Sequence, residues 1–299
     1  MKIAVMGAGG VGCFHGALLA RAGHEVCLIG RPSLVEAVRR DGLRLDSKAF
    51  SGHVPISASA SFEAASDAEL VLVCVKSGDT ESAGATMAPH LSADVVVMSL
   101  QNGVDNAERL AAACGRAVIP AAVYVAVGME GPGHVRHHGR GDLMIGDTPN
   151  SARIAALMSE AGIPTDVSPD VRVALWEKLA INCAFNALSA IPQIQYGELM
   201  AFPGVADVMR DVIDECREVA KASGILLSAH LDAVARRIAQ TMASQRSSTA
   251  QDMAAGKRSE IDHLNGYIAH RGEALGVPVP VNRALWVMVR LLERGTRGA

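Results

Sequence analysis

Excess basic charge and long apolar runs are both missing from this sequence, and each absence excludes a class of partner. The 299 residues contain 28 Lys and Arg against 31 Asp and Glu, for a formal net charge of −3. This balance leaves no basic footprint of the kind that binds nucleic acid or an anionic membrane. No apolar run reaches the ~20 residues that a membrane-spanning helix needs. We therefore expect neither nucleic acid nor a membrane as a partner.

Patterns typical of disulfides and metal sites are also missing. The six cysteines are widely spaced, with no CxxC pair: Cys13, Cys27, Cys74, Cys114, Cys183 and Cys216. This spacing is typical of reduced thiols in a cytosolic protein. His134, His137 and His138 lie close together without a converging Cys or carboxylate partner, so we expect no metal site. The apolar stretch Ile3–Met6 runs straight into glycines, as a strand does and a signal peptide does not. The expected location is cytoplasmic.

Strand and helix patterns alternate in the first half of the chain, which predicts a doubly wound sheet with helices on both faces. The expected strands are Lys2–Met6, Glu25–Ile29, Leu70–Val75, Asp94–Leu100 and Ala117–Ala126. The expected helices between them are Val11–Arg21, Ser33–Arg40, Ser82–Ala88 and Val104–Ala113. Gly128–Gly146 has the pattern of an antiparallel ribbon, and Arg153–Ala161 that of a helix before a last edge strand at Pro164–Val167.

From Pro169 onward the sequence has no strand pattern. Five segments there have helical spacing: Val171–Ala190, Gly204–Ser223, Ala229–Met242, Glu260–Leu275 and Asn282–Arg294. A chain of this length is too long for one small core and fits two domains. We therefore predict an α/β fold, with an N-terminal doubly wound sheet over residues 1–168 and an all-α C-terminal domain over residues 169–299.

The hexapeptide Gly7-Ala8-Gly9-Gly10-Val11-Gly12 fits the G-x-G-x-x-G pattern of a dinucleotide-binding turn. It follows an expected strand and opens an expected helix, which is the context that the pattern requires. Gly7 permits the tight turn, Gly9 lets the backbone approach a pyrophosphate, and Gly12 lets helix and strand pack closely. The phosphates would meet N–H groups at the positive end of the helix. The N-terminal domain is therefore predicted to be Rossmann-like; the alternative is a glycine turn without a ligand.

The end of the second expected strand distinguishes NADP from NAD. Enzymes that use NAD tend to have an Asp or Glu there, ~20 residues after the glycines, to hold the ribose 2′-OH. This chain has no carboxylate at that point, and Arg31 stands where a guanidinium could hold a 2′-phosphate. We therefore predict NADP(H) as the cofactor; the alternative is that Arg31 is a solvated surface charge.

Lys76 and Asn102 follow the next two expected buried strands. Ligands of open α/β sheets bind at the carboxyl ends of the strands, so both side chains would lie near the nicotinamide and ribose. Each could instead be an ordinary turn residue without a ligand, since Asn102-Gly103 is a turn dipeptide. Because Lys76 and Asn102 occupy equivalent positions after two strands, we favour a ligand-binding role for both.

Lys178, Asn182 and Asn186 are spaced i, i+4 and i+8 in a segment that is otherwise almost entirely apolar. On a helix they form one narrow polar stripe. Burying an unpaired amide costs about 1–3 kcal/mol and an unpaired ammonium more, so the stripe must face partners or a cleft. A satisfied contact between core helices is the alternative. Three residues in register, one of them a lysine, favour a site.

A lysine in such a stripe suits the reduction of a ketone, which needs a hydride on carbon and a proton on oxygen. The ammonium can polarise the carbonyl and then supply the proton. Neutral amides can orient the substrate without competing for that proton. Because burial disfavours a charged lysine and a nearby carboxylate favours it, we expect a carboxylate partner in the second domain.

These residues together resemble the ketopantoate reductase family over nearly the whole chain. The resemblance rests on Gly7–Gly12, Arg31, Lys76, Asn102-Gly103, the run Trp176-Glu177-Lys178-Leu179-x-x-Asn182-x-x-x-Asn186, and on Ser248, Asp252 and Glu260-Ile261-Asp262-x-x-Asn265-Gly266. It implies that Lys178 is the general acid and that Asn182 and Asn186 orient the substrate. It also implies that Ser248 contacts the substrate near its carboxylate, and that Glu260 is the carboxylate near the lysine.

The reaction implied by the resemblance is NADPH-dependent reduction of 2-dehydropantoate to (R)-pantoate, on the route to pantothenate and coenzyme A. Lys76 and Asn102 would then line the nicotinamide and the substrate. Tyr196 stands where well-known members have a further substrate-contacting Asn. Because Tyr is bulkier and cannot repeat the amide's contacts, another small 2-oxo acid is an open alternative. A 3-hydroxy acid dehydrogenase and a non-catalytic NADP-binding sensor are further alternatives, and a homodimer is an open possibility for the assembly.

Overall fold

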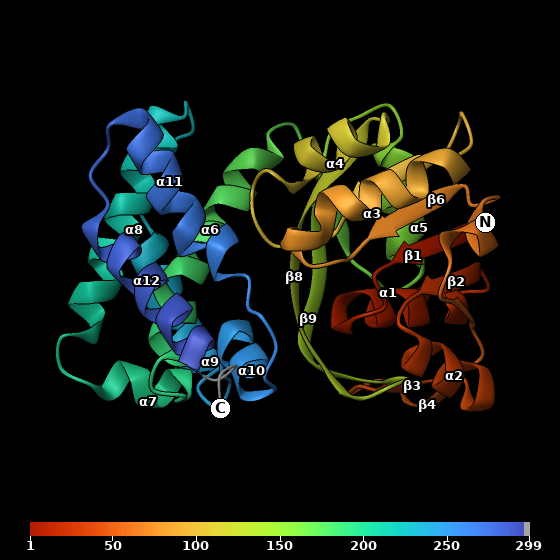
Figure 1. The fold of residues 1–299 in the computed structure, drawn as a ribbon, viewed down its shortest axis with the longest axis horizontal. Coiled ribbons are helices and arrows are strands. Elements are labelled where there is room, and N and C mark those ends of the chain that lie inside the picture. Colours follow the sequence, from red (N-terminus) through yellow and green to blue (C-terminus); the bar gives the residue numbers. More distant parts are fainter. Residues whose placement is uncertain (296–299) are drawn as a thin grey trace. The chain divides into compact units, whose positions relative to one another are not determined.

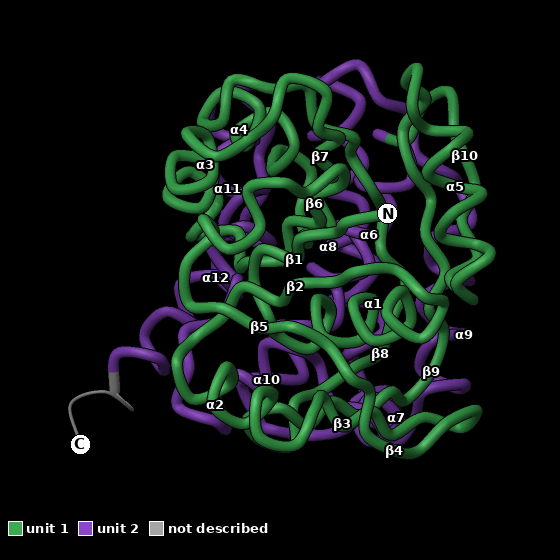
Figure 2. The backbone as a smooth tube through the Cα atoms, turned by 90° about the vertical axis from the view of Figure 1, so that its right-hand side faces the viewer, with its two compact units in different colours: residues 1–171 green, residues 172–299 purple. Residues whose placement is uncertain are grey.

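The computed structural model describes residues 1–295, and the chain divides into two compact units, Met1–Val171 and the part from Arg172 onward (Figure 2). In the first unit, ten strands form one sheet in the order β4-β3-β9-β8-β7-β6-β1-β2-β5, with β10 beside β9. The strands are β1 (Lys2–Met6), β2 (Glu25–Ile29), β3 (Leu43–Asp46), β4 (Ser51–Val54), β5 (Ser57–Ser59), β6 (Leu70–Val73), β7 (Val96–Ser99), β8 (Val118–Gly131), β9 (His134–Gly146) and β10 (Thr165–Ser168).

Helices cover both faces of this sheet (Figure 1). They are α1 (Gly10–Arg21), α2 (Pro32–Asp41), α3 (Thr80–Met87), α4 (Asn106–Cys114) and α5 (Ser151–Glu160). Strand β6 has apolar side chains on both faces of the sheet. Leu70 and Leu72 pack in the core with α1, α2 and α5, whereas Val71 and Val73 pack in the core with α3 and α4. All four side chains are fully buried, as expected of a parallel strand between two helical layers.

The second unit is helical, and the described residues from 169 onward include no strand. Its helices are α6 (Val171–Ala190), α7 (Tyr196–Ala201), α8 (Val205–Ala222), α9 (Leu231–Thr241), α10 (Ser248–Ala254), α11 (Asn265–Leu275) and α12 (Pro280–Gly295). The predicted fold class, a Rossmann-like sheet followed by an all-α part, is therefore confirmed. Within residues 1–295, no helix is both long enough and apolar enough to cross a membrane.

The segment Glu260–Leu275, predicted as one helix, is interrupted. A 3₁₀ turn, η4, covers Ile261–His263, and α11 starts at Asn265 after the single residue Leu264. At the interruption, the buried Asn265 side chain donates to Cys183 O and Asn282 Oδ1, which fixes the start of α11 on other parts of the unit. At Gly266, the second residue of α11, a Cβ would lie only 2.9 Å from Trp286 Nε1, so the glycine leaves room for that ring.

The region between the second helix and the Leu70 strand contains three strands that the sequence did not predict, β3, β4 and β5. The predicted strand at Ala117–Ala126 and the predicted ribbon are also continuous: β8 runs to Gly131 and turns into the antiparallel β9. The sheet therefore has more strands than the alternation of strand and helix patterns alone predicts.

Candidate functional site

The glycine turn joins β1 to α1, and its three motif glycines have different structural reasons. Gly7 has φ +105°, and a Cβ there would lie 2.5 Å from Val75 N. A Cβ at Gly12 would lie 2.3 Å from Gly7 O. A Cβ at Gly9 would meet no atom within 4 Å. The fold itself therefore requires Gly7 and Gly12, whereas Gly9 keeps the space beside the turn open.

The remaining residues of the turn fix its path. Gly7 N and Ala8 N both donate to Ile29 O at the end of β2, at 3.1 and 3.0 Å. Gly10 is the first residue of α1, and Val11 follows it. The helix has no acidic residue in its first turn and no side-chain cap, so its positive end is available to an anion. This arrangement fits the pyrophosphate of a dinucleotide.

Arg31 follows β2 and precedes α2, whose first residue is Pro32. Its side chain is exposed, and among the described residues it has neither an ion-pair nor a hydrogen-bond partner. The first turn of α2 also lacks an acidic residue. A guanidinium and a helix N-terminus without an acidic neighbour are together suited to a phosphate.

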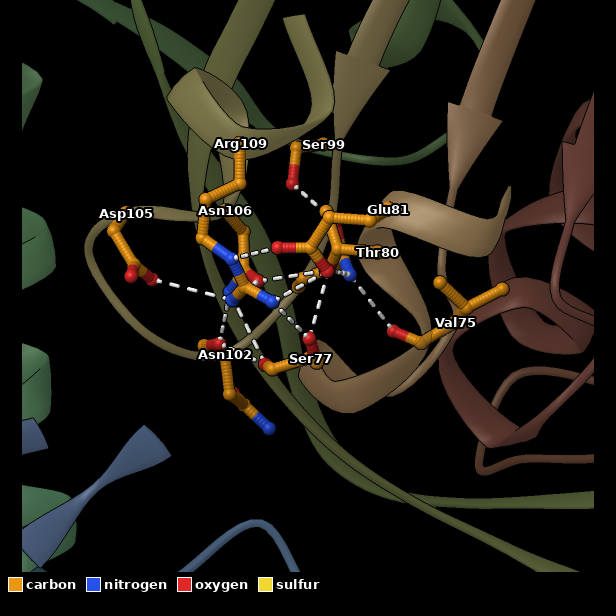
Figure 3. Close-up of polar contacts among 10 residues, drawn as sticks. Val75, Ser77, Thr80, Glu81, Ser99, Asn102, Asp105, Asn106 and Arg109 are labelled. Atoms are coloured by element: carbon orange, nitrogen blue, oxygen red, sulfur yellow. Dashed lines mark hydrogen bonds and ion pairs between the residues drawn. The ribbon is translucent and has the colours of Figure 1, made fainter. Parts of the chain in front are cut away.

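Lys76 and Asn102 lie just beyond β6 and β7, and both are partly buried. Because β7, β6, β1 and β2 are adjacent parallel strands, their carboxyl ends bring Asn102, Lys76, the glycine turn and Arg31 to one edge of the sheet. Hydrogen bonds from Ser77 Oγ to Asn102 O and from Gln101 Nε2 to Val75 O join the loops after β6 and β7, and Figure 3 shows the Asn102 side chain pointing away from them. The structure thus brings all the predicted cofactor-side positions together within the first unit.

The predicted polar stripe lies on α6 in the second unit. Lys178 and Asn182 are partly buried, and Asn186 is only 3% exposed. Among the described residues, the side-chain nitrogen of Asn186 has no hydrogen-bond partner. A buried donor without an acceptor costs about 1–3 kcal/mol, so this amide is suited to an acceptor that a ligand brings.

Ser248 and Asn186 come close through the neighbouring Ser247. Ser247 Oγ donates to Asn186 O at 3.2 Å, and Ser247 N donates to Ser189 Oγ at the same distance. Ser247 also caps α10, because its Oγ accepts from Ala250 N. Ser248, the first residue of that helix, is exposed beside the end of the stripe.

Tyr196 lies at the same end of α6. Its ring packs on Phe185, with 4.5 Å between ring centroids, and its N–H donates to Gln245 O at 2.9 Å. Burial raises the pKa of Tyr196 to about 12, so the phenol stays neutral and can donate or accept a hydrogen bond. Tyr196 thus packs on the residue that precedes Asn186 in the sequence.

Glu260 immediately precedes η4 and is partly buried. Its segment is tied to α6 by Asn265, which is fully buried and whose Nδ2 donates to Cys183 O at 3.1 Å. Cys183 lies between the two stripe asparagines in the sequence. Glu260 therefore belongs to a segment fastened to the middle of the predicted catalytic helix.

Sequence reasoning missed the polar side chains that fasten these elements. In the first unit these are Ser77, Thr80, Gln101 and Asn106, and in the second unit Ser247 and Asn282. In the first unit a weak signal was present, because polar residues cluster directly after two apolar strand patterns and before a short helix. Within residues 1–295, no group of three or more His, Cys, Asp or Glu side chains could hold a metal ion.

Comparison with known proteins gives a consistent family assignment for both parts of the chain. Residues 3–150 match the family described as ketopantoate reductase PanE/ApbA, and residues 170–293 match its C-terminal family. A 2-dehydropantoate 2-reductase of Archaeoglobus fulgidus is 33% identical over 299 residues, covering 98% of each chain. One of Halobacterium salinarum is 34% identical over 303 residues, covering 98% of this chain and 99% of that protein.

Solved structures agree in fold. A PanE/ApbA family ketopantoate reductase from Ralstonia eutropha JMP134 is 55% identical with a TM-score of 0.96, covering 99% of this chain and 100% of that chain. A ternary structure of D-mandelate dehydrogenase with NADH and anilino(oxo)acetate has a TM-score of 0.94 and 23% identity, covering 99% of both chains. At that identity, the second likeness concerns the fold alone.

Proposed function

The chain belongs to the ketopantoate reductase family of oxidoreductases, and we propose that it reduces 2-dehydropantoate to (R)-pantoate with NADPH. The observation that carries the proposal is the stripe on α6. Its amide at Asn186 is buried without a hydrogen-bond acceptor among the described residues, and its lysine is on the same helical edge. An oxygen of a 2-oxo acid would supply the missing acceptor.

The first unit supports binding of the nicotinamide cofactor, which supplies a hydride when bound. The open space at Gly9 and the uncapped start of α1 are suited to its pyrophosphate. The preference for NADPH over NADH is proposed from Arg31, which has no acidic partner among the described residues and precedes the start of α2. An Asp or Glu at that point would instead favour the ribose 2′-OH of NADH.

The second unit would supply the proton and the substrate contacts. Lys178 would polarise the ketone and donate a proton to its oxygen as the hydride reaches carbon. Asn182 and Asn186 would hold the substrate in line, and Ser248 would contact its carboxylate. Glu260 would stabilise the charged lysine and accept from the product hydroxyl. The ketone oxygen would then become a neutral hydroxyl, and Lys178 would be left as a neutral amine until it takes up a proton from solvent.

The proposal is tested by Lys178→Ala, with Lys221→Ala as the matched control. Lys221 is an exposed lysine in the last turn of α8, outside the proposed site. We expect Lys178→Ala to lower kcat about 10²-fold or more, which is the contribution of a general acid, and to keep NADPH affinity. The control should keep wild-type kcat. Near-normal turnover by Lys178→Ala would remove the role of this residue.

A second candidate is a reductase of another 2-oxo acid with a larger apolar side chain. The observation that favours it is the packing of Tyr196 on Phe185, which puts an aromatic pair at a position where the family resemblance implies an amide. A panel of 2-oxo acids with small, branched and aromatic side chains distinguishes the two candidates. Activity only on 3-oxo acids would indicate a 3-hydroxy acid dehydrogenase. Tight NADPH binding without any acceptor would indicate a sensor.

A further inference from the structure

A buried polar network joins the loop after β6 to the loop after β7, at the sheet edge where the predicted cofactor-side residues lie (Figure 3). From it we infer that Thr80 and Asn106 are positioning residues, which hold Lys76 and Asn102 in the geometry needed for the nicotinamide and substrate. The inference rests on the proposed function, because it concerns how two residues of that site are placed.

Thr80 is the centre of the network. It is fully buried at the first residue of α3. Its hydroxyl accepts from Gln101 Nε2 at 2.8 Å and lies 3.0 Å from both Ser77 O and Asn106 Oδ1, to either of which it can donate. A single hydroxyl thus connects residues from both loops.

Asn106 makes the second connection, from the start of α4. Its Nδ2 donates to Asn102 O at 2.5 Å and to Ser77 Oγ at 3.1 Å. Ser77 Oγ in turn donates to the same Asn102 carbonyl at 2.7 Å. The main chain of Asn102 is therefore held by two buried donors, and its side chain points away from the network.

Lys76 is held from both sides in the sequence. Gln101 Nε2 donates to Val75 O at 3.1 Å, and Arg109 Nη2 donates to Ser77 O at 2.9 Å. Arg109 is itself fixed by a bidentate ion pair with Glu81: Nε donates to Oε1 at 2.7 Å and Nη2 donates to Oε2 at 2.8 Å. The residues that flank Lys76 are thus tied to the same network that holds Asn102.

The targets of these bonds distinguish positioning from simple stabilisation of the fold. The carbonyls of Val75, Ser77 and Asn102 belong to the loops that carry the two site residues, and not to the strand ladder or to helix interiors. The β6–β7 ladder and the close contact of Gly84 with Leu110 and Ala113 between α3 and α4 are made by other groups. Loss of the network should therefore shift the loops by a fraction of an ångström, and misplacement of about 1 Å can cost about 10²-fold in rate.

The test is Thr80→Val, which removes the hydroxyl but keeps the shape, beside Thr80→Ser, which keeps the hydroxyl. Ser151→Ala is the matched control: Ser151 is also fully buried, its hydroxyl donates to Gly146 O at 2.6 Å, and its helix packs on β9 and β10. NADPH affinity, kcat, KM and thermal unfolding are measured for all of them. Ser77→Ala, which deletes the 2.7 Å bond to Asn102 O, serves if Thr80→Val does not fold.

We expect Thr80→Val to lower kcat/KM about tenfold and to raise the Kd of NADPH about fivefold, with Thr80→Ser within about twofold of wild type. Ser151→Ala should lower Tm about as much as Thr80→Val does, but it should change neither kcat/KM nor the Kd of NADPH. Wild-type kinetics and NADPH affinity in Thr80→Val, or equal kinetic losses in Ser151→Ala, would overturn the inference. If the wild type reduces no 2-oxo acid, the proposed function fails, and the NADPH affinities alone then decide the inference.

Discussion

Replacing Gly9 by Ala should remove most of the affinity for NADPH while leaving the fold intact. A Cβ at this position meets no protein atom within 4 Å, and its backbone, with φ −89° and ψ −165°, is allowed for any residue. The cost to the start of α1 is about 1 kcal/mol or less, which lowers the Tm of a unit of this size by about 2–4 °C. The methyl group would occupy the path of the pyrophosphate, so we expect Kd to rise at least about tenfold, or about 1.4 kcal/mol.

Gly12→Ala in the same turn is the contrasting variant. Its Cβ would lie 2.3 Å from Gly7 O and 2.8 Å from Val5 Cγ1. Neither the main chain nor a fully buried valine can move aside without a large cost in free energy. Overpacking of this kind costs about 3 kcal/mol, which lowers Tm by about 6–12 °C. Gly12→Ala should therefore lose stability in the absence of any cofactor.

The two variants are compared by thermal unfolding without cofactor and by NADPH fluorescence titration. The account requires opposite patterns: Gly9→Ala loses affinity but little stability, and Gly12→Ala loses stability first. Wild-type affinity in Gly9→Ala would show that no ligand approaches this residue. An equal drop in Tm for both variants would show that the Cβ contacts at Gly9 and Gly12 do not decide stability.

Three further predictions concern single side chains. Arg31→Ala should raise the Kd of NADPH about 10- to 100-fold, the value of a charge-assisted bond, and leave that of NADH unchanged in the same titration; equal effects on both would refute a 2′-phosphate contact. Asn186→Leu should raise the KM of the 2-oxo acid about tenfold without lowering Tm, because it removes a buried donor that has no acceptor among the described residues; a lower Tm at unchanged KM would make Asn186 a structural residue. Burial lowers the pKa of His15 to about 4, below its ordinary value of 6.5. Stability from the neutral ring is therefore complete above pH 6.5 and is lost as pH falls toward 4, so between pH 7 and pH 5 the wild type should lose about 2 kcal/mol more than His15→Leu in denaturant unfolding.

The elements that the sequence predicted well are those with strong local patterns. The bounds of β1, β2 and α6 agree with the prediction residue for residue, because each is a continuous apolar or helically spaced segment. β5, with the sequence Ser57-Ala58-Ser59, has no such pattern and is a strand because β2 pairs with it. The short helices α7 and α10, of six and seven residues, are shorter than the window in which helical periodicity can be recognised.

The candidate site divides in the same way. Chemically distinctive residues such as the motif glycines, Arg31 and Lys178 stand out by type and spacing. The network around Thr80 does not, because Thr, Ser and Asn after a strand are common turn residues. Only the pairing of β6 with β7 brings Thr80 and Asn106 into contact across 26 residues of sequence. Residues that act by holding others are therefore recognised from tertiary contacts.

The most direct test of the proposed reaction is to follow the absorbance of NADPH when 2-dehydropantoate is added to the wild-type protein. The account predicts oxidation of NADPH that depends on the acceptor, that is much slower with NADH, and that falls about 10²-fold in Lys178→Ala. No oxidation with this acceptor or any other 2-oxo acid, despite saturable NADPH binding, would contradict it.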